Sequence, residues 1–233
     1  MSDLLTAGGL ERFGAVAAAH VGDEKVPGLV ALVARGDQVH VEALGSLSIG
    51  GPPVRRDSLF RIASTTKPVT GAATLALVRD GLFSLDERVD GLLPELASPR
   101  VLRRMDGPLD ETVPATRPIT VCDLLTFTFG FGMVMDMFTA PEPWPVVAAA
   151  TVLRLSTIGP PNPAEQPDPD TWIHALGSLP LLSAGRGRAA GLGPARGPVE
   201  PTANVRRRGA GLVSTADDLL AFARMLLRGG CHW

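Results

Sequence analysis

The sequence predicts an α+β fold that is mostly helical and contains an antiparallel sheet. Two runs rich in β-branched residues, 28–35 and 38–44, flank the pair Gly36-Asp37 and predict a β-hairpin. Helical patterns account for most of the remaining structure, and the clearest of them covers residues 64–80. An early hairpin accompanied by several helices therefore indicates the α+β class.

The helix at 64–80 is predicted from its apolar spacing and from one proline. Its apolar residues, which we expect to form a single buried stripe, are Val69, Ala72, Ala73, Ala76 and Leu77. Pro68 has no N–H group and is tolerated only in the first turn of a helix, so the helix should begin near Ser64 or Thr65. Gly81 is expected to end it.

Three further helices are expected. Residues 10–20 form a short amphipathic pattern that predicts one helix, and residues 120–126 predict another. The last helix is predicted by the S-x-x-D capping pattern of Ser214 and Asp217, by the apolar spacing that follows, and by the glycines at 229–230. We also expect Asp217 and Asp218 to be helix-capping and solvated charges.

Composition divides the chain into one structured domain and one loose segment. Residues 183–208 hold no aromatic residue, six arginines, and many Gly, Ala and Pro. Such a segment cannot bury enough surface to offset its ordering entropy. We therefore expect a domain at 1–182, a loose segment at 183–208, and a C-terminal helix of the same domain at 209–233. A proline-rich loop is expected at 160–169.

Charge and composition exclude several classes of function. The 233 residues carry a net charge of −2, so nothing indicates binding to nucleic acid or to an anionic membrane. No uncharged apolar run reaches 18 residues, the opening Met-Ser-Asp-Leu-Leu does not resemble a signal peptide, and two distant cysteines cannot form a disulfide scaffold. We expect a cytoplasmic protein. Its oligomeric state is left open.

The motif Ser64-Thr65-Thr66-Lys67 is the strongest candidate for chemistry. A spacing of three places the serine hydroxyl and the lysine amine on one side of a helix. A serine needs a neighbouring base to act as a nucleophile. Burial and the positive end of a helix both disfavour a charged ammonium, so we expect Lys67 to accept the serine proton. The alternative is a serine cap followed by a solvated lysine.

The segment around this motif resembles a known family. Residues 59–70, LFRIASTTKPVT, look like the nucleophile segment of the serine β-lactamase-related hydrolases, which include class C β-lactamases, DD-peptidases and β-lactamase-like esterases. The resemblance continues through GLFSLDERVDGLLPEL at 81–96 and RPITVCDLLTFTFGFGMV at 117–134. It includes 163–182 and resumes with GAGLVSTADDLLAFARMLLRGG at 209–230.

The resemblance implies a serine β-lactamase/transpeptidase-like fold and acyl transfer to Ser64. Lys67 would serve as the base, and the substrate would be a small ester, amide or β-lactam. No metal or organic cofactor is implied. In this family the stretch that holds Phe127, Phe129 and Phe131 borders the active-site cleft, so these side chains are candidates for substrate binding, although packing against the domain is the simpler interpretation.

Two departures from the family pattern weaken the prediction of activity. The family places a Tyr-x-Asn or Tyr-x-Ser motif after the region of Leu182, and this sequence contains no tyrosine. The sequence also reaches Trp233 without a His-x-Gly or Lys-Thr-Gly motif and without the family's C-terminal strands. We therefore expect an internal deletion or a shifted reading frame at 183–208, a truncated C-terminus, an incomplete sheet and impaired activity. The alternative is an inactive remnant, or a pseudoenzyme that binds a ligand or partner.

Other reactive residues show no pattern of a site. The four histidines are scattered without an acidic residue at a metal-binding or triad spacing. His40 alternates with apolar neighbours in the second strand of the hairpin and is expected to face outward. Cys122 falls in a predicted helix and is expected to be a small core residue.

Overall fold

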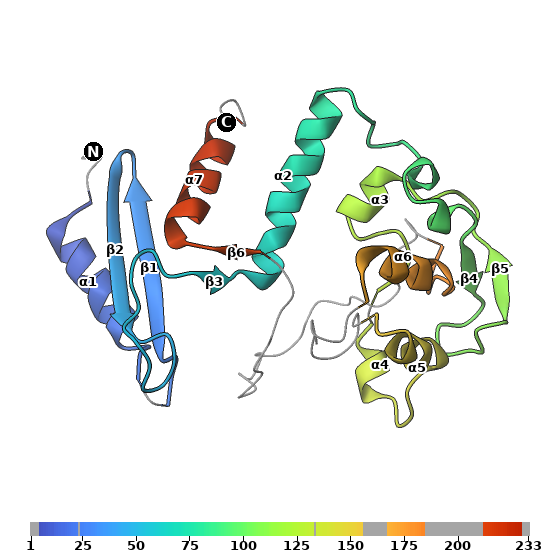
Figure 1. Cartoon of the computed structure of the whole chain (residues 1–233), viewed down its shortest axis with the longest axis horizontal. Helices are drawn as coiled ribbons and strands as arrows, with labels where there is room; N and C mark the ends of the chain where they lie inside the picture. The colour runs from blue at the N-terminus through green and yellow to red at the C-terminus, as the bar shows by residue number, and fades with distance from the viewer. Residues whose placement is uncertain (1–4, 23, 133, 156–166, 185–211, 230–233) are drawn as a thin grey trace. The chain divides into compact units, whose positions relative to one another are not determined.

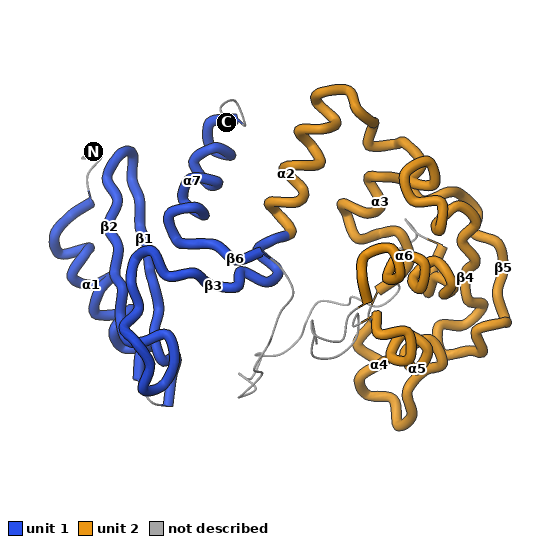
Figure 2. Tube along the Cα trace, viewed as in Figure 1, with its two compact units in different colours: residues 1–66, 211–233 blue, residues 67–210 orange. Residues whose placement is uncertain are grey.

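The computed structural model describes residues 5–22, 24–132, 134–155, 167–184 and 212–229. The chain divides into two compact units, shown in Figure 2: unit 1 comprises residues 1–66 and 211–233, and unit 2 comprises residues 67–210. Most of the predicted loose segment, the last four residues, and most of the proline-rich loop lie outside the described residues.

The secondary structure confirms an α+β fold (Figure 1). The helices are α1 (Ala7–Ala18), α2 (Thr66–Arg79), α3 (Val121–Leu125), α4 (Asp136–Thr139), α5 (Pro145–Val152), α6 (Pro169–Gly177) and α7 (Ala216–Leu227). The strands are β1 (Gly28–Arg35), β2 (Gln38–Gly45), β3 (Phe60–Arg61), β4 (Arg100–Leu102), β5 (Thr112–Pro114) and β6 (Val213–Ser214). The strands pair antiparallel as β1-β2, β3-β6 and β4-β5.

Unit 1 is built on the predicted hairpin. Strands β1 and β2 pair from Gly28 with Gly45 to Arg35 with Gln38, and Gly36 adopts a φ of 56° that favours glycine in the turn. Helix α1 packs beside β2 and helix α7 beside β1 (Figure 1). A two-stranded sheet is marginal on its own, so the two helices supply the packing that the hairpin needs.

The prediction that His40 faces outward was wrong. Its ring lies edge-on to Phe13 of α1, with ring centroids 6.1 Å apart, and Nε2 lies 2.7 Å from a carboxylate oxygen of Glu42. Helix α1 covers this side of the hairpin. The alternation of residues along the strand does not by itself show which side a helix covers. His40 is therefore a half-buried packing residue.

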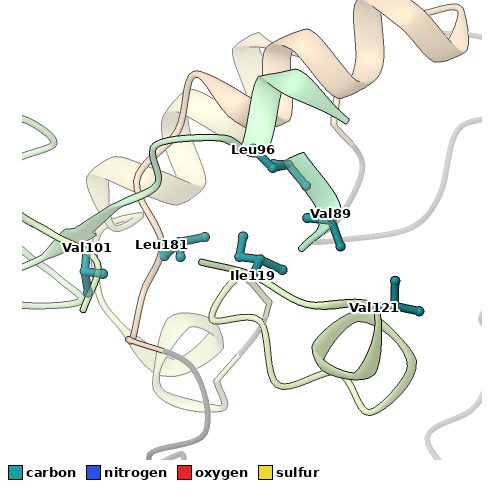
Figure 3. Packing of buried hydrophobic residues seen from close by; sticks show 6 residues of the cluster. All are labelled: Val89, Leu96, Val101, Ile119, Val121 and Leu181. Atoms are coloured by element: carbon teal, nitrogen blue, oxygen red, sulfur yellow. The ribbon is translucent and has the colours of Figure 1, made fainter. Parts of the chain in front are cut away.

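Unit 2 contains the hydrophobic core. Six buried residues from different elements form the cluster in Figure 3: Val89, Leu96, Val101, Ile119, Val121 and Leu181. Two further clusters pack around Val146 and Leu155, which are 2% and 1% exposed. The predicted helix at 120–126 is α3, and it begins with Thr120 as its cap.

Helix α2 differs from the prediction in its packing. It runs from Thr66, preceded by a short 3-10 turn, and Gly81 follows it with a φ of 76°, as expected for a helix stop. None of its residues is buried, and Leu75 and Leu77 are 52% and 42% exposed. The predicted buried stripe was therefore wrong, because apolar spacing predicts burial only where another element covers that face.

Helix α7 begins one residue later than its predicted capping pattern. The cap is Thr215, whose hydroxyl accepts from the Asp218 N–H, and the Asp218 carboxylate accepts from the Thr215 N–H. Ser214 pairs with Phe60 in strand β6, and Thr215 is also extended, with φ −102° and ψ 168°, so the helix begins only after Thr215. The predicted pairing of Ser214 with Asp217 was therefore wrong by one residue at both positions.

Candidate active site

Ser64 lies in a strained turn. It is the middle residue of the 3-10 turn η1 (Ala63–Thr65), and Ala63 has a φ of 43°. A left-handed conformation at a residue with a Cβ costs about 1–3 kcal/mol and persists only where surrounding contacts hold it. Such strain is common at functional sites.

The contacts that hold this turn come from a segment far along the chain. Strand β6 pairs with β3, and beyond the last strand pair the Ile62 N–H donates to the Leu212 carbonyl at 3.0 Å. The Leu212 N–H donates to the hydroxyl of Thr66, also at 3.0 Å. One residue therefore contacts the chain on both sides of Ser64.

Lys67 lies in the first turn of α2, three residues after Ser64. Thr66, between the two elements, has helical dihedrals of −59° and −32°. Ser64 and Lys67 are both exposed, so the expectation that Lys67 is buried was wrong. The reason is the same as for the apolar stripe, because α2 buries none of its residues.

An ion pair joins α7 to the segment that precedes β3. The guanidinium of Arg56 donates two hydrogen bonds to the carboxylate of Asp217, at 2.7 and 2.8 Å. These bonds lower the pKa of Asp217 below its usual value. Asp217 is therefore an ion-pair partner rather than the helix cap. Both side chains are exposed, so the pair is a weak link.

The three predicted phenylalanines have different environments within unit 2. Phe127 has a φ of 56° and is 66% exposed. Phe129 and Phe131 stack with their centroids 6.4 Å apart, and both pack against the buried core. These contacts favour a packing role for Phe129 and Phe131, and substrate binding by any of the three remains a prediction.

A buried charge network beside these phenylalanines was missed by the sequence analysis. Asp123 is 0% exposed and accepts two hydrogen bonds from Arg117, at 2.6 and 3.0 Å. The Asp123 carboxylate also accepts from the N–H and hydroxyl of Thr120 and from the hydroxyl of Thr128. The Arg117 guanidinium, aided by Thr120, holds the pKa of Asp123 far below its usual value despite burial. The pattern Thr-x-x-Asp at 120–123 was the signal available in the sequence.

Neither a metal cluster nor a membrane helix occurs in the described part of the chain. No group of three or more His, Cys, Asp or Glu side chains gathers there in a way that could hold a metal ion. No helix there has the length and apolar character needed to span a bilayer. Cys122 is half-buried in α3 rather than fully buried as a core residue.

The chain matches a known protein family over most of its length. The family model named Beta-lactamase matches residues 13–189, which is most of the chain. The chain belongs to the beta-lactamase family. The matched residues include the S-x-x-K segment, and the predicted resemblance to serine β-lactamase-related hydrolases is confirmed.

Several proteins are 39–40% identical to parts of this chain. Lovastatin esterase from Penicillium rubens is 40% identical over 103 residues, which are 42% of this chain and 25% of that enzyme. Esterase EstB from Burkholderia gladioli is 39% identical over 114 residues, 47% of this chain and 26% of that enzyme. A protein of Mycobacterium tuberculosis is 39% identical over 132 residues, 57% of this chain and 29% of that protein.

One solved structure to which this chain is similar is that of simvastatin synthase (LovD) from Aspergillus terreus. It is 28% identical, with a TM-score of 0.47, over 58% of this chain and 36% of that chain. The chain thus spans well under half of the length of each of these relatives.

Proposed function

We propose that this chain carries the nucleophile segment of a serine hydrolase or acyltransferase that acts on small acyl esters. Ser64 is the nucleophile and Lys67 is its base. The observation that carries this proposal is the position of Ser64 in a strained turn immediately before a helix that bears Lys67 in its first turn. Strain held by distant contacts is typical of a residue that must be presented in one orientation.

The chemistry follows from the two side chains. The Ser64 hydroxyl oxygen attacks the acyl carbonyl carbon while the Lys67 amine takes its proton. The bond from the carbonyl to the leaving alcohol then breaks, and the lysine ammonium returns the proton to that alcohol. Water or a second alcohol attacks the acyl-serine and releases the acid or a new ester.

The relatives favour an ester over a β-lactam. Two of them bear the name esterase, and others bear the name acyltransferase. Esterases and acyltransferases share the acyl-enzyme step and differ in which nucleophile resolves it. A small acyl ester is therefore the substrate class that we assign to this chain.

The composition favours slow turnover. A second proton-transfer group would contribute roughly a hundredfold or more in rate, and the sequence has no tyrosine to serve as one. We expect acylation of Ser64 to outpace hydrolysis of the acyl-enzyme. The second candidate function, an inactive family remnant, rests on the same absence of tyrosine.

Covalent labelling with a fluorophosphonate probe tests the proposal. We expect the wild-type chain to be labelled once, at Ser64, as located by mass spectrometry of the peptides. Labelling should disappear in Ser64→Ala and persist in Ser58→Ala, which removes a serine of the same unit. Lys67→Gln should slow labelling at least roughly a hundredfold. The sequence has only two lysines, so Lys25→Gln is the matched control.

The same samples distinguish the two candidates. A folded wild-type chain that is not labelled contradicts the proposal and supports the inactive remnant. A burst of p-nitrophenol from p-nitrophenyl acetate, equal to one per chain and followed by a slow phase, supports acylation with slow turnover. Circular dichroism with thermal melting establishes that each variant is folded.

A further inference from the structure

Two hydrogen bonds of Leu212, to Ile62 and to Thr66, lie on either side of Ser64, and together they are called the Leu212 bracket. Beyond the pairs of Phe60 with Ser214 and Arg61 with Val213, the chain leaves the strand geometry. The Leu212 carbonyl accepts from the N–H of Ile62, two residues before Ser64, and the Leu212 N–H donates to the Thr66 hydroxyl, two residues after it. The Thr66 hydroxyl oxygen takes the place of the carbonyl that would continue the ladder.

This bracket encloses the strained residue. Ala63, with its φ of 43°, lies between the two bonds, as does Ser64. A turn held on one side alone could relax toward an ordinary helical start, which would rotate the Ser64 Cα–Cβ bond. Bonding both ends to a single residue limits the distance between Ile62 and Thr66 and so restricts the backbone conformation of the three residues between them.

We infer that Thr66 is a positioning residue for Ser64. Its hydroxyl anchors the helix start to Leu212, the residue before strand β6, and so keeps Ala63 in its left-handed conformation next to Ser64. The inference rests on the proposed function insofar as Ser64 is the nucleophile. The Leu212 bracket itself consists only of hydrogen bonds within unit 1.

The alternative is that Thr66 merely stabilises the start of α2. A stabilising role would lower the melting temperature of any variant that lacks the hydroxyl and would leave the reactivity of the folded protein unchanged. A positioning role would change the reactivity of Ser64 in protein that is still folded. Displacement of a reacting group by about 1 Å can cost roughly a hundredfold in rate.

The test compares three variants of the full chain. Thr66→Val keeps the shape and removes the hydroxyl, and Thr66→Ser keeps the hydroxyl. Thr74→Val is the matched control, because the Thr74 hydroxyl donates to the Thr70 carbonyl at 3.0 Å in the same helix. The first measurement is the second-order rate of fluorophosphonate labelling at Ser64. The second is the hydrogen-exchange rate of the Ile62 and Thr65 amides, which does not depend on activity.

We expect Thr66→Val to be labelled at least about tenfold more slowly than wild type, with selectively faster exchange at residues 60–66. Thr66→Ser should restore both, and Thr74→Val should change neither. Equal labelling rates in wild type and Thr66→Val overturn the inference and leave the proposed function intact. If the wild type is not labelled, the proposed function fails. If Thr66→Val also leaves the exchange rate at Ile62 unchanged, the role of the Leu212 bracket is overturned as well. Faster exchange along the whole of α2, and not selectively at residues 60–66, indicates the merely stabilising role and also overturns the inference.

Discussion

Different kinds of interaction stabilise the two units of this chain internally. All but two of the buried apolar residues in the described part of the chain belong to unit 2, the exceptions being Ala17 and Val54. Unit 1 instead joins distant segments through strand pairing, the Leu212 hydrogen bonds and the pair of Arg56 with Asp217. The proposed nucleophile thus belongs to the unit with less buried apolar surface.

The difference shows where each unit is vulnerable. A packed core loses stability in proportion to the apolar volume removed from it. A unit held by exposed hydrogen bonds and ion pairs opens locally at low cost, and functional segments are often drawn from such regions. Truncation of core side chains should therefore lower the unfolding free energy of unit 2. In unit 1, single polar substitutions where distant segments are bonded to each other should cause local opening.

The largest expected effect is from Leu155→Ala in unit 2. Leu155 is 1% exposed and packs against Leu176 and Leu179, so its truncation should cost about 3 kcal/mol of unfolding free energy. The matched substitution in unit 1, Leu32→Ala, removes a half-buried side chain and should cost about 1 kcal/mol. Urea unfolding read by hydrogen exchange of peptides from each unit measures both. Equal losses would remove the contrast between the units.

A smaller effect is expected from Asp123→Asn. The amide keeps the shape but removes the charge that Arg117 binds, so unit 2 should lose about 2 kcal/mol at neutral pH. Arg117 lowers the pKa of Asp123 in the folded state, so this stability is present above the unfolded pKa and is lost as the pH falls below about 4. Asp123→Asn should flatten that acid dependence.

The measurement is tryptophan fluorescence in a Trp233→Phe background, where Trp144 and Trp172 report on unit 2 alone. Asp106→Asn is the control, since Asp106 pairs with Arg104 at an exposed position. It should leave the acid dependence nearly unchanged. If both variants changed the acid dependence of stability equally, the burial of Asp123 would not be the cause of its larger expected effect.

The smallest effect is expected from Arg56→Ala in unit 1. The pair with Asp217 is exposed, so global stability should hardly change, while hydrogen exchange in 212–229 should speed up at low salt. High salt should erase the difference. Arg55→Ala, which breaks the adjacent local pair with Asp57, should leave 212–229 unchanged. The same response to both substitutions would contradict a link between α7 and the segment that precedes β3.

The sequence predicted what local patterns determine. The hairpin was predicted to within one residue, because β-branched runs around a glycine turn have few alternatives. The helix stop at Gly81 followed from a conformation that glycine adopts easily. The start of α2 at Thr66, one or two residues after the predicted start, followed from Pro68.

The sequence did not predict what depends on distant partners. Whether α2 is buried depends on a covering element, and the direction in which His40 faces depends on where α1 packs. The hydrogen bonds of Leu212 to residues on either side of Ser64 join positions about 150 residues apart, as the separation of 146 for Thr66 shows. Asp123 could have been found, since its cap with Thr120 is local, but its burial could not.

Unit 1 is assembled from segments that precede and follow unit 2. During synthesis on a ribosome, residues 67–210 emerge before β6 and α7 exist, so unit 2 has all its parts while β3 still lacks its partner strand. The turn that carries Ser64 can gain its final hydrogen bonds only after Leu212 has left the exit tunnel. The surroundings of the proposed nucleophile are thus completed only after the whole of unit 2 has been synthesised.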